Sequence, residues 1–451
     1  MSRPSGHLHA VVRRLLVVSV TVALGAWGIG NASAAFSWRQ FQGTTLHVLL
    51  SDSHWQQVMQ ASFPDFEERT GIKLAVEVFP QGQLWDVLEH GLDEPGRVDV
   101  FMTVPNLDGL RFLRLGKVHP VTAFLRDPDR TAPEFAWDDI LPKTRAAMEW
   151  DGEILGPPVM GEHLALLYRK DLFQDSKMTA PATLAELEAA ARFFQSKTME
   201  GRFGRGVGVV MRGQGTLATS VYAGVLHALG GHWLDAEGRS TVASQESVSA
   251  LEMLGRLATC SSTRLTTFGW QEALEMFSSG SAAMYLEGSS IYPLLEENSA
   301  SRVRGKVGYA LFPSGPGGPG TSVAVKGLAI GARSSNPAAA WLFLQWAAGP
   351  EMSRRALQKG VLVGRQSTWR DPALDPPVPA DLAQSFQQAG RIGNPVWAPP
   401  MVAVTAGRET IGKAVEAAFK GEDVRAAAQA AQQRMAEIQA ATEPASSARR
   451  P

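Results

Sequence analysis

The strongest constraint on the fold is a regular alternation of strand-like and helix-like segments early in the chain. Three short apolar runs, at residues 44–51, 73–80 and 98–104, have the composition of buried strands. The segments between them, 54–72 and 84–92, carry apolar residues at helical spacing. Parallel strands need a helical crossover between them, so this order predicts a parallel α/β sheet.

Length and composition limit the alternatives. A chain of 451 residues is too long for one ordinary hydrophobic core, so two lobes are expected. Hydrophobic residues make up 45% and charged residues 19%, which is typical of a globular chain. The net charge is −1, and it becomes −4 without the first 34 residues, which contain three arginines and no acid. This balance argues against a nucleic-acid-binding surface.

The first 34 residues have the pattern of an export signal. Arg13 and Arg14 precede an apolar run that is short for a membrane span, and Ala32-Ser33-Ala34 is a small-residue cleavage site. We therefore expect a signal peptide at 1–34, cleaved near Ala34, and a periplasmic protein. An uncleaved membrane anchor is the alternative, and the arginine pair leaves general or twin-arginine export open.

Cysteine usage agrees with this interpretation. Cys260 is the only cysteine, so neither an intrachain disulfide nor a cysteine zinc cluster can form. Because no cysteine stands at the expected cleavage site, where Ala35 follows Ala34, a lipoprotein is not expected.

The rest of the chain continues the α/β pattern. The first helical segment is expected to end at Gly71, and residues 158–173 form a long extended run. A strand at 206–212 precedes a helix from Thr216, and Glu237-Gly238 suggests a hairpin. Further helices are expected, the last two at 402–420 and 422–438.

One short segment suggests where a site lies. In FSSGSAAMYLEGSS, residues 277–290, a buried-looking strand from Ala282 to Leu286 runs directly into Glu-Gly-Ser-Ser. A strand that ends in a polar loop is where α/β proteins usually hold a ligand.

Four segments in order resemble one family. Residues 63–80, 156–173, 277–290 and 326–351 look like the motifs of extracellular solute-binding proteins of sugar-type ABC importers, the maltose-binding-like family. Arg169 stands where that family usually has Asn. The four stretches cover nearly the whole chain after residue 34.

The resemblance implies a type II periplasmic-binding-protein fold. In this α/β fold each of two lobes is a mainly parallel sheet flanked by helices, and several chain crossovers form a hinge. The crossovers are expected near Pro158–Tyr168, Val325–Ala329 and Val361–Ser367. The implied segments are lobe I at 36–157 and 328–362, lobe II at 158–327 and 363–441, and a disordered tail at 442–451.

The resemblance and the strand-end loops together suggest twelve ligand-binding residues. They are Asp52, His54, Trp55, Asn106, Glu162, His163, Gln214, Glu287, Gly288, Ser289, Arg365 and Trp397. Carboxylates such as Glu162 and Glu287 accept hydrogen bonds from paired hydroxyls, and Ser289 and His163 can also bond them.

The aromatic and cationic candidates have competing interpretations. Trp55 and Trp397 are placed to stack on a sugar ring, although a tryptophan near a helix start is almost as often part of a core. Arg365 is placed to bind hydroxyls or an anionic group, or else is a surface charge. Ser290 stands where the family often has Trp, which argues against a large oligosaccharide. A phosphate ligand would need more cations than Arg365 and Arg212.

Enzyme signatures are weak. Gly213-x-Gly215-x-x-Ala218 resembles a dinucleotide-binding loop, but Asp235 lies in the expected hairpin and not at the end of a parallel strand. The same helix start suits a bound solute, so Gln214 stays among the candidates. HExxH, GxSxG and P-loop motifs are missing from the sequence, and neither a cofactor nor a metal is expected.

The predicted function is therefore capture without chemistry. A sugar, sugar alcohol or related polyol would be bound by lobe closure and delivered to the permease of an ABC importer by a monomeric protein. The alternatives are another solute, such as a glycerophosphodiester, polyamine or oligopeptide, and a secreted carbohydrate-active enzyme. The identity of the ligand is left open.

Overall fold

The computed structural model describes residues 36–196 and 206–443. The predicted signal peptide and residues 444–451 of the predicted tail lie outside these ranges. The predicted boundary of the tail needs a correction, because Thr442 is the last residue of a helix and Glu443 forms an ion pair with Arg114. In the described ranges, none of the helices is both long enough and apolar enough to pass through a bilayer.

One mixed sheet runs through the fold. Its strand order is β2-β1-β3-β11-β7-β9-β8, with β10 paired to β7 and β4 paired to β11. The strands of this sheet are β1 Thr45–Ser51, β2 Lys73–Phe79, β3 Val100–Thr103, β4 Val118–His119, β7 Pro158–Arg169, β8 Val207–Met211, β9 Ala282–Gly288, β10 Val307–Leu311 and β11 Val323–Gly331. A separate pair is formed by β5 Glu149–Trp150 and β6 Glu153–Ile154.

The expected α/β class is confirmed, but the prediction of mainly parallel sheets needs a correction. β1 pairs in parallel with β2 and β3, and β8 pairs in parallel with β9. β7, β10 and β11 pair antiparallel with their neighbours in the middle of the sheet. These long-range returns of the chain make the sheet mixed.

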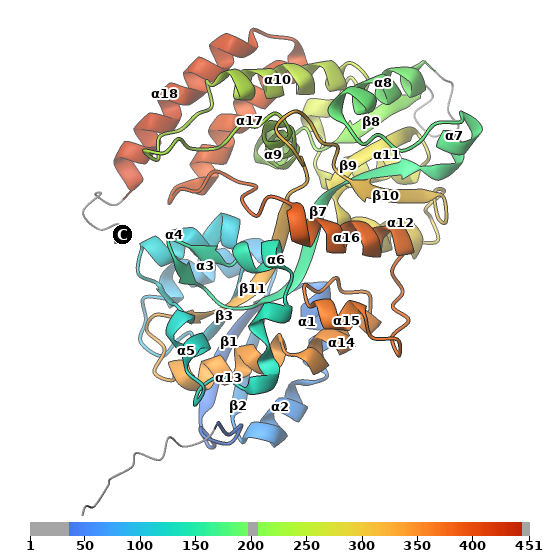
Figure 1. Cartoon of the computed structure of the whole chain (residues 1–451). Coiled ribbons are helices and arrows are strands. Elements are labelled where there is room, and N and C mark those ends of the chain that lie inside the picture. Colours follow the sequence, from blue (N-terminus) through green and yellow to red (C-terminus); the bar gives the residue numbers. More distant parts are fainter. Residues whose placement is uncertain (1–35, 197–205, 444–451) are drawn as a thin grey trace, which may run out of the picture. The chain divides into compact units, whose positions relative to one another are not determined.

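Helices flank the sheet (Figure 1). In the first half they are α1 His54–Gln60, α2 Phe63–Thr70, α3 Gln81–Gly91, α4 Leu110–Arg114, α5 Thr122–Arg126, α6 Pro142–Ala146, α7 Lys170–Asp175, α8 Leu184–Gln195 and α9 Thr219–Ala228. In the second half they are α10 Gln245–Ala258, α11 Trp270–Ser278, α12 Tyr292–Glu296, α13 Pro337–Ala347, α14 Pro350–Gln358, α15 Gln366–Trp369, α16 Ala380–Ile392, α17 Val404–Lys420 and α18 Val424–Thr442. α13 packs against β11, and α17 packs against α10 and α18.

Local sequence explains the first helices. The expected single helix after β1 is broken into α1 and α2, because Pro64 lacks the N–H that would continue the helical ladder. Gly71 ends α2 with φ of 71°, the left-handed conformation predicted for it. Further along, Thr183 and Glu186 form a capping box that starts α8.

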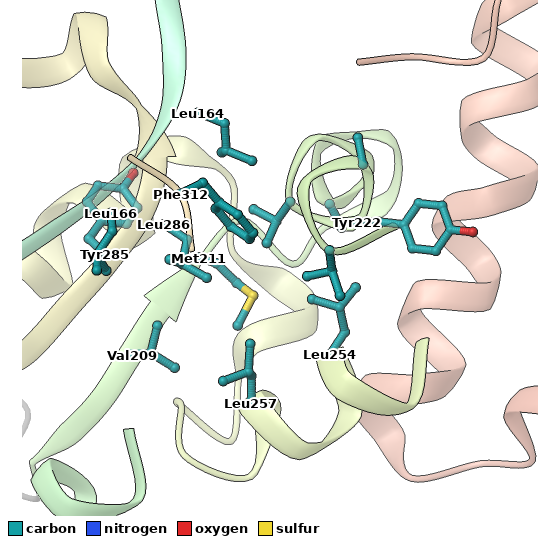
Figure 2. Packing of buried hydrophobic residues seen from close by; sticks show 14 of the residues in the cluster. Leu164, Leu166, Val209, Met211, Tyr222, Leu254, Leu257, Tyr285, Leu286 and Phe312 are labelled. Carbon is teal, nitrogen blue, oxygen red and sulfur yellow. The ribbon is translucent and has the colours of Figure 1, made fainter. Parts of the chain in front are cut away.

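The buried side chains form two hydrophobic clusters. The first core contains β1, β3, β11 and α13, and the second core contains β8, β9, α9, α10 and α17. Figure 2 shows Met211 of the second core lying near Leu257 and Leu286.

β7 carries the chain from one core to the other. Val159 belongs to the first core, and Leu164 to Leu167 belong to the second. β11 begins beside β7, where Ala324 is the register partner of Glu162. Val323 and Val325 already lie in the first core, a few residues before the predicted start of its second segment at 328.

Candidate ligand-binding site

Lys326 on β11 lies close to several polar side chains between the two cores. Lys326 Nζ donates a hydrogen bond to Ser51 Oγ at the end of β1, over 3.1 Å. Burial lowers the pKa of Lys326, and the nearby carboxylates of Glu162, Asp108 and Asp52 oppose that shift. The strand-end loop of the first core and the crossover strand therefore contribute acidic groups around one buried cation.

Glu162 on β7 connects this lysine with the loop after β9. The Ser290 hydroxyl donates to Glu162 Oε2, and the His163 backbone N–H donates to Ser289 Oγ over 3.1 Å. A Cβ added at Gly288 would lie 2.5 Å from Glu162 Oε2, so a larger residue here would have to push the end of the Glu162 side chain aside. The loop at 288–290, whose polar character suggested a site, is thus held directly against the crossover strand.

Glu287 has a different role from the predicted one. Arg212 donates to both of its carboxylate oxygens, and Tyr285 Oη donates to Oε2 over 2.8 Å. Glu287 is only 3% exposed, and its own loop donates through Gly288 N. Burial alone would lower the pKa of Arg212, but the charge and hydrogen bonds of Glu287, together with the effects of Tyr285 and Glu162, outweigh burial and raise it. With its oxygens occupied, Glu287 positions Arg212 and is not a free acceptor for a hydroxyl.

Asn106 and Trp397 are brought together by the segment that follows α16. Asn106 Nδ2 donates to Pro395 O and Trp397 N donates to Asn106 Oδ1, both over 2.9 Å. The Arg408 guanidinium lies 5.4 Å from the centre of the Trp397 ring. The Asn106 amide therefore ties the loop after β3 to this segment, and Trp397 presents a partly exposed ring beside a cation.

Trp55 must be removed from the predicted set. It is 1% exposed and belongs to the first core, so neither face of its ring is open to a ligand. The core interpretation of a tryptophan near a helix start is the correct one here.

Arg365 must also be removed, because the structure buries it as a cross-link of the first core. Its guanidinium donates to Phe135 O and Ala348 O, both over 2.9 Å, and to Ala136 O and Asp139 Oδ2, both over 3.2 Å. Burial lowers its pKa, although the Asp139 carboxylate opposes that shift. Neither a surface charge nor a ligand contact describes this side chain.

The other predicted residues fall in two groups. Asp52 is exposed and accepts from Gln57 Nε2 over 2.8 Å; His54 and Gln214 are also exposed. His163 is fully buried; neither of its ring nitrogens has a partner in the described part of the chain, and burial lowers its pKa to about 3. His163 therefore faces the protein interior and not a solute.

The glycines of the dinucleotide-like loop have a packing role. A Cβ at Gly213 would collide with the backbone carbonyl of Leu265, and Gly215 has φ of 48°. Backbone contact and conformation account for both glycines without a phosphate.

Several polar residues near the candidate site were not predicted from the sequence. Gln81 starts α3 directly after β2, and both of its side-chain polar atoms are buried without a partner in the described ranges. Asp108 accepts from Trp85 Nε1 over 2.7 Å, and burial raises its pKa to about 6. A lone lysine inside the apolar run VAVKGLAIG was a visible signal for Lys326, whereas Arg408 gave none.

A metal site is not found among the described residues, and cavities elsewhere do not involve the candidate residues. Within the described residues, no three His, Cys, Asp or Glu side chains are grouped to hold a metal ion. A cavity of about 570 Å³ lies between β10 and α16, but it contains none of the candidate residues. The arrangement of Lys326, Glu162 and Ser290 offers hydrogen-bond donors and acceptors at close range, which suits hydroxyl groups.

Two cores joined by crossover strands, with polar loops where the strands change core, define a two-lobed solute-binding protein. The pattern of the family described as "Bacterial extracellular solute-binding protein" matches residues 52–353. The chain belongs to this family, and the resemblance read from its motifs is confirmed.

Relatives and solved structures agree with the family. The chain is 26% identical to the erythritol/L-threitol-binding protein of Mycolicibacterium smegmatis over 358 residues, 74% of this chain and 72% of the relative. It is 27% identical to the mannitol-binding protein of Pseudomonas aeruginosa over 298 residues, 64% of each chain. A solute-binding protein of Agrobacterium radiobacter K84, solved in complex with ribitol, is 25% identical with a TM-score of 0.73, covering 88% of this chain and 99% of its own.

Proposed function

We propose that this protein captures a short sugar alcohol or a related polyhydroxylated solute and delivers it to the permease of an ABC importer. The observation that carries the proposal is the group of polar contacts where β7 and β11 join the two cores: Ser290 donates to Glu162, and Lys326 donates to Ser51. Relatives that bind erythritol or L-threitol and mannitol, and a similar structure with ribitol, support a polyol as the ligand.

The aromatic residues favour a short ligand. Trp55 is buried in the first core, and Ser290 stands where the family often has Trp. Trp397 is then the remaining candidate for stacking among the predicted residues. A ligand held mostly by hydrogen bonds, with one apolar contact, fits a linear polyol better than an oligosaccharide.

Binding would act through lobe closure. A solute that bonds groups from both cores stabilises the closed form by its higher affinity for that form. The carboxylate arrangement does not favour glycoside hydrolysis, which uses two cooperating carboxyl groups, because the oxygens of Glu287 are occupied by Arg212 and Tyr285. Export by the N-terminal signal, a periplasmic location and a monomeric state complete the proposal.

A thermal-shift panel on the protein tests the ligand class. It contains sugars, polyols of four to six carbons, their acid and phosphate derivatives, and amines and peptides as the competing classes. A ligand at about a hundred times its Kd stabilises the folded protein by about 2.7 kcal/mol. The proposal is wrong if no polyhydroxylated compound raises the melting temperature.

A pair of variants tests the site. Glu162→Gln should weaken binding of the best ligand by about 1.5–3 kcal/mol, because a charge-assisted hydrogen bond becomes a neutral one. Glu437→Gln changes a carboxylate on α18 that is half exposed and distant in sequence from the site, and it should leave the affinity unchanged. Equal affinities for both variants would remove Glu162 from the site.

A further inference from the structure

Arg408 is a largely buried cation whose partners are all neutral. Its Nε donates to Thr219 Oγ1 over 3.0 Å, and its Nη2 donates to Thr216 O over 2.8 Å. Among the described residues no carboxylate forms an ion pair with Arg408, and its Nη1 makes no hydrogen bond. A buried charge without a counter-ion is costly, so charged side chains inside proteins are usually paired.

The positive charge of Arg212 makes the environment of the Arg408 guanidinium still less favourable. Burial and the charge of Arg212 both lower the pKa of Arg408, to about 10. Of the two carboxylates that act on Arg212, Glu287 already forms a bidentate ion pair with it, and Glu162 accepts a hydrogen bond from Ser290. Neither of these carboxylates forms an ion pair with Arg408.

The position of Arg408 connects it with the candidate site. Its guanidinium lies over the ring of Trp397, whose backbone is tied to Asn106 of the loop after β3. Arg212 is close enough to Glu162 for that carboxylate to act on its pKa. Arg212 donates to Glu287, and the next residue, Gly288, lies against Glu162, so Arg212 and Glu162 belong to one polar region, and the Arg212 charge acts on Arg408.

We propose that the solute bound here carries one terminal anionic group, and that Arg408 receives it while Lys326 and Glu162 bind the hydroxyl groups of the chain. The inference rests on the proposed function and makes the ligand class narrower: a polyol acid is preferred to a neutral polyol. The planar guanidinium fork fits a carboxylate with two parallel hydrogen bonds. A phosphate monoester is also anionic, with a charge of about −1.5 to −2 at pH 7, and the experiment separates these two sources.

Calorimetric titration with matched ligands tests the proposal. Erythritol, ribitol and mannitol are each compared with the aldonate of the same carbon number and with the polyol phosphate. The best anionic ligand should bind about 10 to 100 times more tightly than its neutral counterpart, as expected for a charge-assisted hydrogen-bond pair. The tighter anionic series identifies the group as carboxylate or phosphate.

Variants assign this preference to Arg408. Arg408→Gln should reduce the ratio of anionic to neutral affinity to near one, and Arg408→Lys should keep part of it because the charge remains without the planar fork. The control Arg434→Gln alters an exposed arginine of α18 and should leave the ratio unchanged.

The wild-type protein provides a second measurement in case Arg408→Gln does not fold. The affinity for the anionic ligand should fall as salt rises, whereas the affinity for the neutral polyol should not. Neutral polyols that bind as tightly as their acids would overturn this inference and leave the proposed function intact. If neither series binds, the proposed function itself fails.

Discussion

The substitution Trp55→Ala tests whether this tryptophan belongs to the first hydrophobic core or to the ligand site. The side chain is 1% exposed in the first core, so Trp55→Ala removes a large apolar group from a packed environment. A substitution of this kind costs about 3–5 kcal/mol, from lost burial and from the cavity left behind. With an unfolding entropy of about 2.1 cal/mol/K per residue, a chain of about 400 residues should lose about 3–6 °C in melting temperature.

The assay is calorimetric melting of the ligand-free protein together with titration of the folded variant. The variant should bind the solute within about twofold of the wild type, because the ring contacts the core and not the ligand. Trp270→Ala is the matched control, since this tryptophan is 40% exposed and its loss should change the melting temperature by less than about 1 °C. An unchanged melting temperature combined with tenfold weaker binding would refute the core assignment and return Trp55 to the ligand site.

Three further substitutions test the charged interior. Arg365→Leu should destabilise the ligand-free protein by about 3–5 kcal/mol in urea unfolding, because it removes four hydrogen bonds, two of them to carbonyls of the buried residues Phe135 and Ala348. Full stability with lost binding would contradict this. Arg114→Gln breaks the ion pair between Arg114 of α4 and Glu443 after α18, whose side chains are only 15% and 10% exposed. The change should lower the free energy of unfolding by about 1–3 kcal/mol and make α18 more sensitive to protease. An unaltered digestion rate would count against this prediction. Burial lowers the pKa of His163 from 6.5 to about 3, so the folded protein disfavours the protonated ring. Protonation of this histidine in the unfolded chain therefore reduces the free energy of unfolding as the pH falls from about 6.5 towards 3. His163→Phe should therefore reduce the loss of stability between pH 7 and 4.5 by up to about 2.7 kcal/mol, and equal losses in both proteins would exclude the buried histidine as the cause.

Much of the fold was predictable because its signals are local. The strands β1, β2 and β3 are short apolar runs, and Gly71 ends α2 where a left-handed residue was expected. The break between α1 and α2 was also readable from Pro64, since proline begins a helix more readily than it continues one. α16 was overlooked although its buried residues, including Leu382 and Phe386, recur at helical spacing.

The order and direction of the strands could not be derived from local signals. β3 pairs with β11, and β11 pairs with β7, although these strands lie far apart in the sequence. Such pairings depend on how the two cores pack. The alternation of strands and helices therefore predicted the α/β class. The parallel pairing of the first three strands does not hold for the middle of the sheet, where the pairs are antiparallel.

The grouping of some candidate residues could be predicted from the sequence, and their bonding partners could not. The polar loop after an apolar strand, residues 288–290, contacts Glu162 in the structure. Whether a polar residue is free to bind a ligand depends on partners that the local sequence does not reveal. Arg365 is occupied by the carbonyls of Phe135 and Ala136, which are more than two hundred residues away.

For the same reason, the ion pairs of the site could not be predicted from the local sequence. Glu287 was expected to accept hydroxyls, yet Arg212, separated from it by 75 residues, occupies both of its oxygens. Arg408 then remains as a second guanidinium, near enough for the Arg212 charge to lower its pKa, and no carboxylate of the described residues pairs with it. Buried cations in proteins are normally paired because an unpaired charge is poorly solvated there. An anionic group on the solute would complete the pairing that the folded chain leaves open.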